Sequence, residues 1–239
     1  MPAHFHEISL ATPDIRASVE FYERLGFSQA VTGDAWPHPY GVVTDGRLFL
    51  GLHELPPQPP VITFVHPGVA GYATELEARG LMLNERRTDP EEFNVVALED
   101  PSGQLLRFIE ARTYSPVNRD PAESSRCGRF AHFGLPVRDF AAASAFWESL
   151  GFVATEETAD PYPHLPLTSD TLDLGFHSPR FLDLPALVFA GENMAARIAH
   201  LHEQGVESSP DLPRGLDRSS NAVLLAPEGT ALLLVQGTL

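Results

Sequence analysis

The chain has 239 residues, which is enough for two compact domains of roughly 100 to 120 residues each. Its 32 Asp and Glu against 16 Lys and Arg give a formal charge of -16, which disfavours nucleic acid and anionic membrane surfaces as partners. The single cysteine, Cys127, excludes an internal disulfide framework, and no apolar run of about 18 residues is present. We therefore expect a cytoplasmic protein without a membrane segment.

The first elements form a strand followed by an amphipathic helix. A strand is expected over residues 5–11, where Ile8 and Leu10 share an apolar face and Glu7 lies on the opposite face. Asp14 is expected to cap the helix, which should cover the apolar face of the strand. The strands expected next cover residues 28–32 and 40–53, the latter with a turn at 44–46. This order predicts one βαβββ unit.

A second βαβββ unit follows within the same half of the chain. Its helix is expected over residues 69–79 and is closed by Gly80. The strands expected around this helix cover residues 61–65, 81–85, 94–98 and 104–110. The two units together predict a first domain over residues 1–112.

The second half of the chain repeats the first. Asp14 corresponds to Asp139, and Gly26 to Gly151, at a constant offset of 125 (139 minus 14, and 151 minus 26). The elements expected in this half are strands over 130–137, 171–177, 185–190, 222–225 and 230–236, a helix after Asp139 and a helix over 194–203. A polar, aperiodic stretch separates the halves, so we expect a linker over 113–128 and a second domain over 129–239.

Two motifs recur in the halves: the helix endings FYERLGF and FWESLGF, and the turns EDPSGQLLRFIE and LAPEGTALLLVQ. Together with the four units, these motifs resemble the vicinal oxygen chelate superfamily, which includes glyoxalase I, extradiol dioxygenases and bleomycin-resistance proteins. The resemblance implies an α+β fold in which four βαβββ units form two glyoxalase-like domains with curved, mostly antiparallel sheets. It does not imply one activity, since this scaffold serves lyases, dioxygenases and binding proteins alike.

The resemblance also indicates where a divalent cation would be held, since the family's ligands come from the first and last strands of each unit. The residues expected at these positions are Glu7, Gly51, Val61 and Arg107 in the first domain, and His132, Gly175, Ala186 and Leu233 in the second. Neither set supplies three His, Asp or Glu donors, so no metal ligand is assigned and no cofactor is expected. A divalent metal remains an alternative, because a register slip of two residues would bring His177 beside His132.

Glu7 and Arg107 allow two interpretations. In the first, they form a buried salt bridge that fills a degenerate metal site, because either charge alone would be costly to bury. In the second, Arg107 faces the cup and binds a carboxylate or phosphate of a ligand.

The other candidate ligand-binding residues belong to a repeated aromatic-Pro-His motif. Its members are Trp36, His38 and Tyr40 in the first domain and Tyr162 and His164 in the second. They precede predicted strands at the mouths of the cups, where they could stack on a planar ligand or simply cover the sheet edges. His132 is expected to be a pocket residue, and His53 and His177 repeat one another nearby.

We therefore predict a protein with degenerate metal sites that binds a small, partly apolar molecule in a sheet-lined cup. The alternative is a metal-dependent lyase or dioxygenase that uses His132, or a metal-free enzyme with Glu7 as general base. An interaction scaffold is a third possibility if neither cup is open. The expected partner is a small molecule, and the chain is compatible with a monomer or a homodimer.

Overall fold

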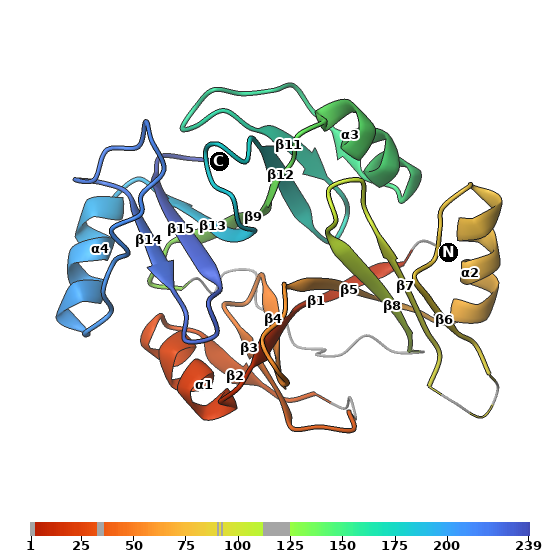
Figure 1. The fold of residues 1–239 in the computed structure, drawn as a ribbon. Coiled ribbons are helices and arrows are strands. Elements are labelled where there is room, and N and C mark those ends of the chain that lie inside the picture. The colour runs from red at the N-terminus through yellow and green to blue at the C-terminus, as the bar shows by residue number, and fades with distance from the viewer. Residues whose placement is uncertain (1–2, 33–35, 90, 92, 112–124) are drawn as a thin grey trace.

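The computed structural model describes residues 3–32, 36–89, 91, 93–111 and 125–239. In these residues the chain forms two curved mixed sheets and four helices, as Figure 1 shows. The predicted α+β class is confirmed. Most strand pairs are antiparallel, whereas β1 with β4, β5 with β8, β9 with β12 and β13 with β15 are parallel.

The first sheet has the strand order β2-β3-β4-β1-β5-β8-β7-β6. Its strands are β1 (His4–Thr12), β2 (Ser28–Ala30), β3 (Tyr40–Thr44), β4 (Phe49–Glu54), β5 (Val61–His66), β6 (Glu85–Arg87), β7 (Val95–Glu99) and β8 (Leu105–Glu110). The first strands of the two units, β1 and β5, are paired at its centre. The sheet therefore joins both units of the first half.

The second sheet repeats this plan in the order β10-β11-β12-β9-β13-β15-β14. Its strands are β9 (Arg129–Pro136), β10 (Val153–Ala154), β11 (Leu165–Thr168), β12 (Asp173–His177), β13 (Ala186–Gly191), β14 (Ala222–Leu225) and β15 (Ala231–Gln236). The described residues between the last helix and β14 form no strand equivalent to β6. Pro210 and Pro213 lie in that stretch, and proline cannot donate to a strand ladder.

The four helices begin and end close to the positions predicted from the sequence. They are α1 (Ile15–Arg24), α2 (Val69–Ala78), α3 (Phe140–Ser149) and α4 (Met194–Glu203). Asp14 and Asp139 cap α1 and α3, since each carboxylate accepts a 3.0 Å hydrogen bond from the backbone N–H three residues on. None of the described helices is long and apolar enough to cross a membrane.

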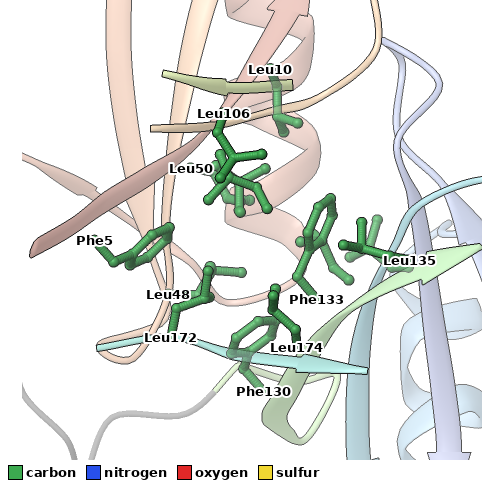
Figure 2. Close-up of a cluster of buried hydrophobic side chains, with 14 of the residues drawn as sticks. Phe5, Leu10, Leu48, Leu50, Leu106, Phe130, Phe133, Leu135, Leu172 and Leu174 are labelled. Carbon is green, nitrogen blue, oxygen red and sulfur yellow. The ribbon is translucent and has the colours of Figure 1, made fainter. Parts of the chain in front are cut away.

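One hydrophobic core joins the two sheets. Ile8 and Leu10 of β1 point into it, as the alternation of that strand predicts. Figure 2 shows side chains of both halves meeting in this core, among them Leu48, Leu50, Phe130, Phe133, Leu172 and Leu174. We call the opposite face of each curved sheet its cup; the first cup carries Glu7 and the second carries His132.

Two reciprocal contacts connect each odd-numbered helix to a turn of the other half. Tyr22 of α1 and Ser18 each donate a 2.7 Å hydrogen bond to the Glu228 carboxylate in the β14–β15 turn. Trp147 of α3 donates a 3.0 Å bond from Nε1 to Asp100 in the β7–β8 turn. Tyr22 and Trp147 occupy equivalent positions in the repeat, so the duplication has preserved the contact with different carboxylates.

Loss of the Glu228 carboxylate is expected to destabilise the protein by about 2 kcal/mol, because the fully buried Tyr22 hydroxyl would lose its acceptor. Urea unfolding of Glu228→Ala measures this change. Glu156→Ala is the control, since Glu156 is exposed, and its unfolding free energy should match that of the wild type. Equal stability of the two variants would contradict the role assigned to Glu228.

Most of the predicted linker, residues 113–124, lies outside the described residues. Its last four residues, 125–128, form a turn that packs against the end of α1, where Arg126 donates a 2.8 Å backbone hydrogen bond to Leu25. Cys127 is fully buried in the shared core. These four residues therefore belong structurally to the packed part of the chain.

Candidate functional site

The cup of the first sheet is organised around a row of three residues on adjacent strands. Glu7 on β1 lies opposite Thr63 on β5, and Thr63 lies opposite Arg107 on β8. Directly opposite residues project from the same face of a sheet. Glu7 and Arg107 thus face the same cup, as the sequence predicted, with Thr63 between them.

The register corrects two predicted positions. Thr63, not Val61, lies opposite Glu7, and Val188, not Ala186, lies opposite His132. Each prediction was wrong by two residues because both strands were positioned by counting back from a helix-ending glycine. The second cup therefore contains the row His132, Val188 and Leu233.

Gly51 and Gly175 provide space for the central residue of each cup. A Cβ added to Gly51 would lie 2.1 Å from the Glu7 carboxyl carbon, and one added to Gly175 would lie 2.4 Å from His132 Nε2. The side chain of the first strand thus occupies the place of a side chain on the neighbouring strand. This packing explains why glycine occupies the same place in the repeated sequences LGLH of β4 and LGFH of β12.

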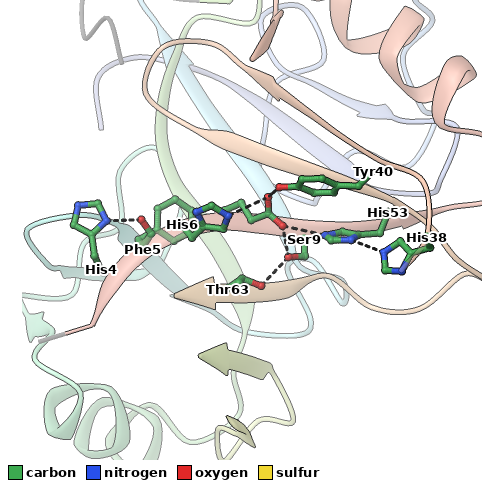
Figure 3. Close-up of polar contacts among 9 residues, drawn as sticks. His4, Phe5, His6, Ser9, His38, Tyr40, His53 and Thr63 are labelled. Atoms are coloured by element: carbon green, nitrogen blue, oxygen red, sulfur yellow. Dashed lines mark hydrogen bonds and ion pairs between the residues drawn. The ribbon is translucent and has the colours of Figure 1, made fainter. Parts of the chain in front are cut away.

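Glu7 is completely buried and accepts three hydrogen bonds, whose donors Ser9, His53 and Tyr40 are labelled in Figure 3. Oε1 accepts from Ser9 Oγ at 2.7 Å and from His53 Nε2 at 3.0 Å, and Oε2 accepts from the Tyr40 hydroxyl at 2.5 Å. Ser9 in turn lies 2.7 Å from Thr63 Oγ1. The carboxylate is therefore satisfied by its immediate neighbours.

These contacts keep Glu7 ionised. Burial alone would raise its pKa, but the hydrogen bond from His53, the charges of His6 and His53, and the hydrogen bond from Tyr40 together hold the pKa below its ordinary value. A buried carboxylate is thus maintained at the base of the cup.

The carboxylate orders two imidazoles in series. An ionised carboxylate can only accept, so His53 Nε2 carries a hydrogen toward Glu7. His53 Nδ1 lies 2.9 Å from His38 Nε2, which places the two rings in hydrogen-bond contact. His38 is partly exposed, and its pKa is lowered by burial and by the nearby charges of His53 and Arg107. A chain of contacts therefore leads from buried Glu7 to the mouth of the cup.

Arg107 does not form the expected ion pair with Glu7. Among the described residues, Glu7 is paired with His53 and Arg107 has no acidic group within 4.0 Å. The reason is geometric, because Thr63 lies between them and neighbouring strands are about 4.8 Å apart. The prediction of a buried Glu7–Arg107 salt bridge was wrong.

Arg107 instead lies beside Trp36. Its guanidinium carbon is 6.0 Å from the centre of the Trp36 ring, within the range of a cation–π contact. Partial burial lowers the pKa of Arg107, yet a guanidinium stays charged at neutral pH. The Trp36 Nε1 atom is buried and has no hydrogen-bond partner among the described residues. The first cup thus offers a cation, an aromatic face and an unused N–H donor.

The second cup brings three imidazoles around one phenol. His132 Nε2 lies 2.7 Å from the Tyr162 hydroxyl, and the Tyr162 ring lies 4.7 Å from that of His164 and 6.4 Å from that of His177. Burial lowers the pKa of His132 to about 3 and that of His177 to about 4. These side chains are therefore neutral at pH 7.

Apolar side chains close the second cup. Phe181 stacks on Tyr162 with ring centres 4.6 Å apart, and Leu182, Leu212, Leu216 and Leu239 pack against the same cluster. Tyr162 and His164 are each only 2% exposed, whereas Trp36 and His38 of the equivalent motif are partly exposed. The repeated motif is therefore partly exposed in the first half and buried in the second.

Neither cup has a donor set that fits a divalent cation. The first row places a threonine and a guanidinium beside Glu7, and the Glu7 oxygens already accept three hydrogen bonds. The second row presents His132 with Val188 and Leu233. No group of three His, Cys, Asp or Glu suited to a metal occurs in the described part of the chain.

Several surface depressions lie outside the first cup, most of them where residues of the two halves meet. One, of about 380 Å³, is lined by Phe5, Arg47, Phe130 and residues 169–173. This depression also presents polar side chains, Arg47 and Asp170 among them, but it lacks the buried carboxylate and the linked imidazoles of the first cup. The combination of a buried carboxylate, two linked imidazoles and a partly exposed cation therefore makes the first cup the candidate site.

Sequence reasoning placed Glu7, Trp36, His38, Tyr40 and Arg107 in one cup, and the structure brings them together. It missed Ser9 and Thr63, which complete the hydrogen bonds beneath the carboxylate. The signal for Ser9 was available, because it lies two residues from Glu7 and so shares its face of the strand. Thr63 could not be placed without the register of β5.

Comparison with known proteins supports the fold. No protein-family model matches the chain, and no curated protein matches it. Among solved structures, a catechol 2,3-dioxygenase is similar over 99% of this chain and 93% of its own, with 14% identity and a TM-score of 0.59. The 2,3-dioxygenase LapB from Pseudomonas sp. KL28 is similar over 100% and 94%, with 16% identity and a TM-score of 0.62.

A variant of homoprotocatechuate 2,3-dioxygenase from B. fuscum is similar over 100% of this chain and 72% of its own length, with 17% identity and a TM-score of 0.63. At these identities the likeness concerns the fold. The chain therefore has the fold of extradiol dioxygenases, and its activity has to be inferred from its own residues.

Proposed function

We propose that the first cup binds a small planar anion, such as an aromatic carboxylate, without using a metal ion. The observation that carries this proposal is Arg107, a partly buried guanidinium that faces the cup and has no carboxylate partner among the described residues. A buried charge without a counter-ion is costly, so an anionic ligand would be favoured there.

Trp36 supports a planar ligand. Its ring lies beside Arg107 and 5.7 Å from the His38 ring, and aromatic faces favour stacking on other planar groups. Its buried Nε1 hydrogen would gain an acceptor on binding. Glu7 repels a second anion from the base of the cup, which favours a ligand whose charge sits at the Arg107 end.

The sealed second cup supports an assignment of binding to the first domain. His132, Tyr162 and His164 were expected to contact ligand, but they are buried among their neighbours. We propose that they contribute to the stability of the second half. We also propose that the first domain ends at residue 112 and that the second begins at residue 129.

Benzoate is expected to bind the wild-type protein in isothermal titration calorimetry, and Arg107→Gln should weaken binding about 10- to 100-fold, because a hydrogen bond to a charged group contributes about 1.5–3 kcal/mol. Arg16→Gln is the matched control, since this arginine is 88% exposed on α1 and should leave binding unchanged.

Neutral benzamide should bind more weakly than benzoate, and treatment with EDTA should leave benzoate binding unchanged. Equal affinity of Arg107→Gln and wild type for benzoate would overturn the proposal. Loss of binding after EDTA treatment would overturn its metal-free part.

A metal-dependent dioxygenase is the second candidate, favoured by the fold match to three 2,3-dioxygenases. It would use His132 in the sealed cup, where the opposite strands offer Val188 and Leu233 in place of donors. We rank it second for that reason. Purified protein that retains one equivalent of Fe(II) after reconstitution and dialysis would reverse this order.

A further inference from the structure

The segment that leads into β3 carries a group that the binding proposal does not use. His38 contacts His53 through Nε2, and no hydrogen bond of its Nδ1 atom is found among the described residues. The ring is partly exposed at the mouth of the cup, beside Trp36 and within the electrostatic influence of Arg107. A base, an aromatic ring and a cation therefore lie close together, since Trp36 is near both His38 and Arg107.

The hydrogen bonds that link Glu7, His53 and His38 determine which ring nitrogen of His38 is the basic one. The charge that His53 exerts on Glu7 belongs to its protonated form; in the neutral form, the hydrogen that ionised Glu7 requires on Nε2 leaves the lone pair of His53 on Nδ1. That lone pair accepts from His38 Nε2, which leaves the lone pair of His38 on Nδ1. The buried carboxylate thus directs the basic nitrogen of His38 away from the chain of contacts.

The same chain can stabilise the protonated product. When Nδ1 of His38 takes up a proton, the ring becomes an imidazolium that donates through Nε2 to His53. Transfer of that second proton to His53 Nδ1 would place the positive charge directly beside Glu7, at the 3.0 Å contact. A buried carboxylate behind an imidazole is a recurring way to orient a general base and to stabilise its charged form.

We propose that the first cup is a metal-free proton-abstraction site in which His38 is the catalytic base, Glu7 and His53 are positioning residues, and Arg107 stabilises the anion formed. The inference rests on the proposed function, because the substrate must occupy the binding cup. The substrate class is a planar carbon acid whose conjugate anion is delocalised onto an oxygen.

The reaction step is balanced without a further reagent. The C–H bond of the substrate breaks, its proton forms an N–H bond at His38 Nδ1, and the electron pair moves through the conjugated system to the oxygen near Arg107. Return of the proton to another carbon gives an isomer, and expulsion of a leaving group gives an elimination product. Glu7 itself is too deeply buried to contact a substrate, which moves the role of base from Glu7 to His38.

The test uses 5-nitrobenzisoxazole, a planar probe in which removal of one C–H proton breaks the N–O bond and releases a coloured cyanonitrophenolate. The full-length protein should accelerate this ring opening with saturation. His38→Gln should lower kcat/KM about 100-fold, the lower range for a general base. His200→Gln, an exposed histidine on α4, is the control and should retain the wild-type rate.

A positioning role for His53 and Glu7 predicts a change in the pH profile. In His53→Gln the apparent pKa of the kcat/KM profile should move, while KM changes less than kcat, because the base remains in place but loses its ordered partner. Glu7→Gln should act in the same direction. An unchanged pH profile in both variants would remove the relay from the proposal.

Benzoate binding separates this inference from the proposed function. If His38→Gln and His38→Ala both bind benzoate normally and keep the wild-type rate of ring opening, the base assignment is wrong although the binding site stands. If ring opening depends on His38 but benzoate does not bind, the anion-binding proposal is wrong. A rate no greater than that of the same concentration of free imidazole would overturn the catalytic inference.

Discussion

Acidification from pH 7 to pH 5 is expected to lower the free energy of unfolding by about 4 kcal/mol through His132 and His177 alone. Their pKa values in the folded protein are about 3 and about 4, whereas an unfolded histidine titrates near 6.5. Between these values the unfolded chain binds protons that the folded chain excludes. Stability is therefore complete above about pH 6.5 and is lost as the pH falls toward 4, with about 2 kcal/mol for each group by pH 5.

Urea unfolding between pH 7.5 and pH 4.5 measures this effect. His177→Gln should reduce the slope of unfolding free energy against pH by about one proton, and the amide can still donate to the Leu182 carbonyl, which His177 Nε2 contacts at 3.2 Å. His200→Gln should leave the slope unchanged, since His200 is exposed.

Acidification also changes the overall charge repulsion of this acidic protein. This change is the same for His177→Gln and His200→Gln, so it cancels when the two variants are compared. A wild-type protein equally stable at pH 7 and pH 5 would contradict the neutral, buried state of both histidines. NMR titration of the two imidazoles gives a second measurement, in which both should remain neutral at pH 5.

Gly51→Ala is expected to destabilise the protein by about 3 kcal/mol or more and to abolish the ordered arrangement of Glu7. The new Cβ would lie 2.1 Å from the Glu7 carboxyl group, so the carboxylate must leave the contacts that compensate its burial. Overpacking costs about 1–3 kcal/mol, and a buried charge that loses its partners adds to that cost.

Gly41→Ala is the matched control. Gly41 lies on the neighbouring strand β3, and a Cβ there would meet no atom within 4 Å, so the free energy of unfolding should change little. Both substitutions convert glycine to alanine within one sheet, which equalises the gain in backbone rigidity. Similar stability of the two variants would show that the Glu7 side chain does not occupy the space above Gly51.

The sequence predicted the fold well because duplication supplied each signal twice. The capping Asp, the helix-ending glycine and the period-2 strands recur in both halves, so the α+β architecture followed from local chemistry. The weakest positions were short strands. Residues 81–85 were expected to form a strand, whereas β6 covers Glu85–Arg87, because pairing with β7 and not local preference sets its limits.

The sequence predicted which residues lie in the candidate site, but not which of them contact one another. Period-2 alternation was sufficient to place Glu7 on the cup face of its strand. The partners of Glu7 depended on strand register, and an error of two residues replaced Thr63 by Val61, so the residue that separates Glu7 from Arg107 was not identified. The difference between an open and a sealed cup depended on Phe181 and the other apolar residues of long loops, which carry no periodic signal.

The shared core gives the sealed copy a thermodynamic role. Leu50 and Phe133 belong to one apolar cluster, so the energy that orders the second half also holds the rear face of the first sheet in place. Burial of a carboxylate carries a desolvation cost, and a domain of about 110 residues has only a small core to offset that cost. The buried second half contributes to this shared core, and so supports the sheet that carries the polar residues around Glu7.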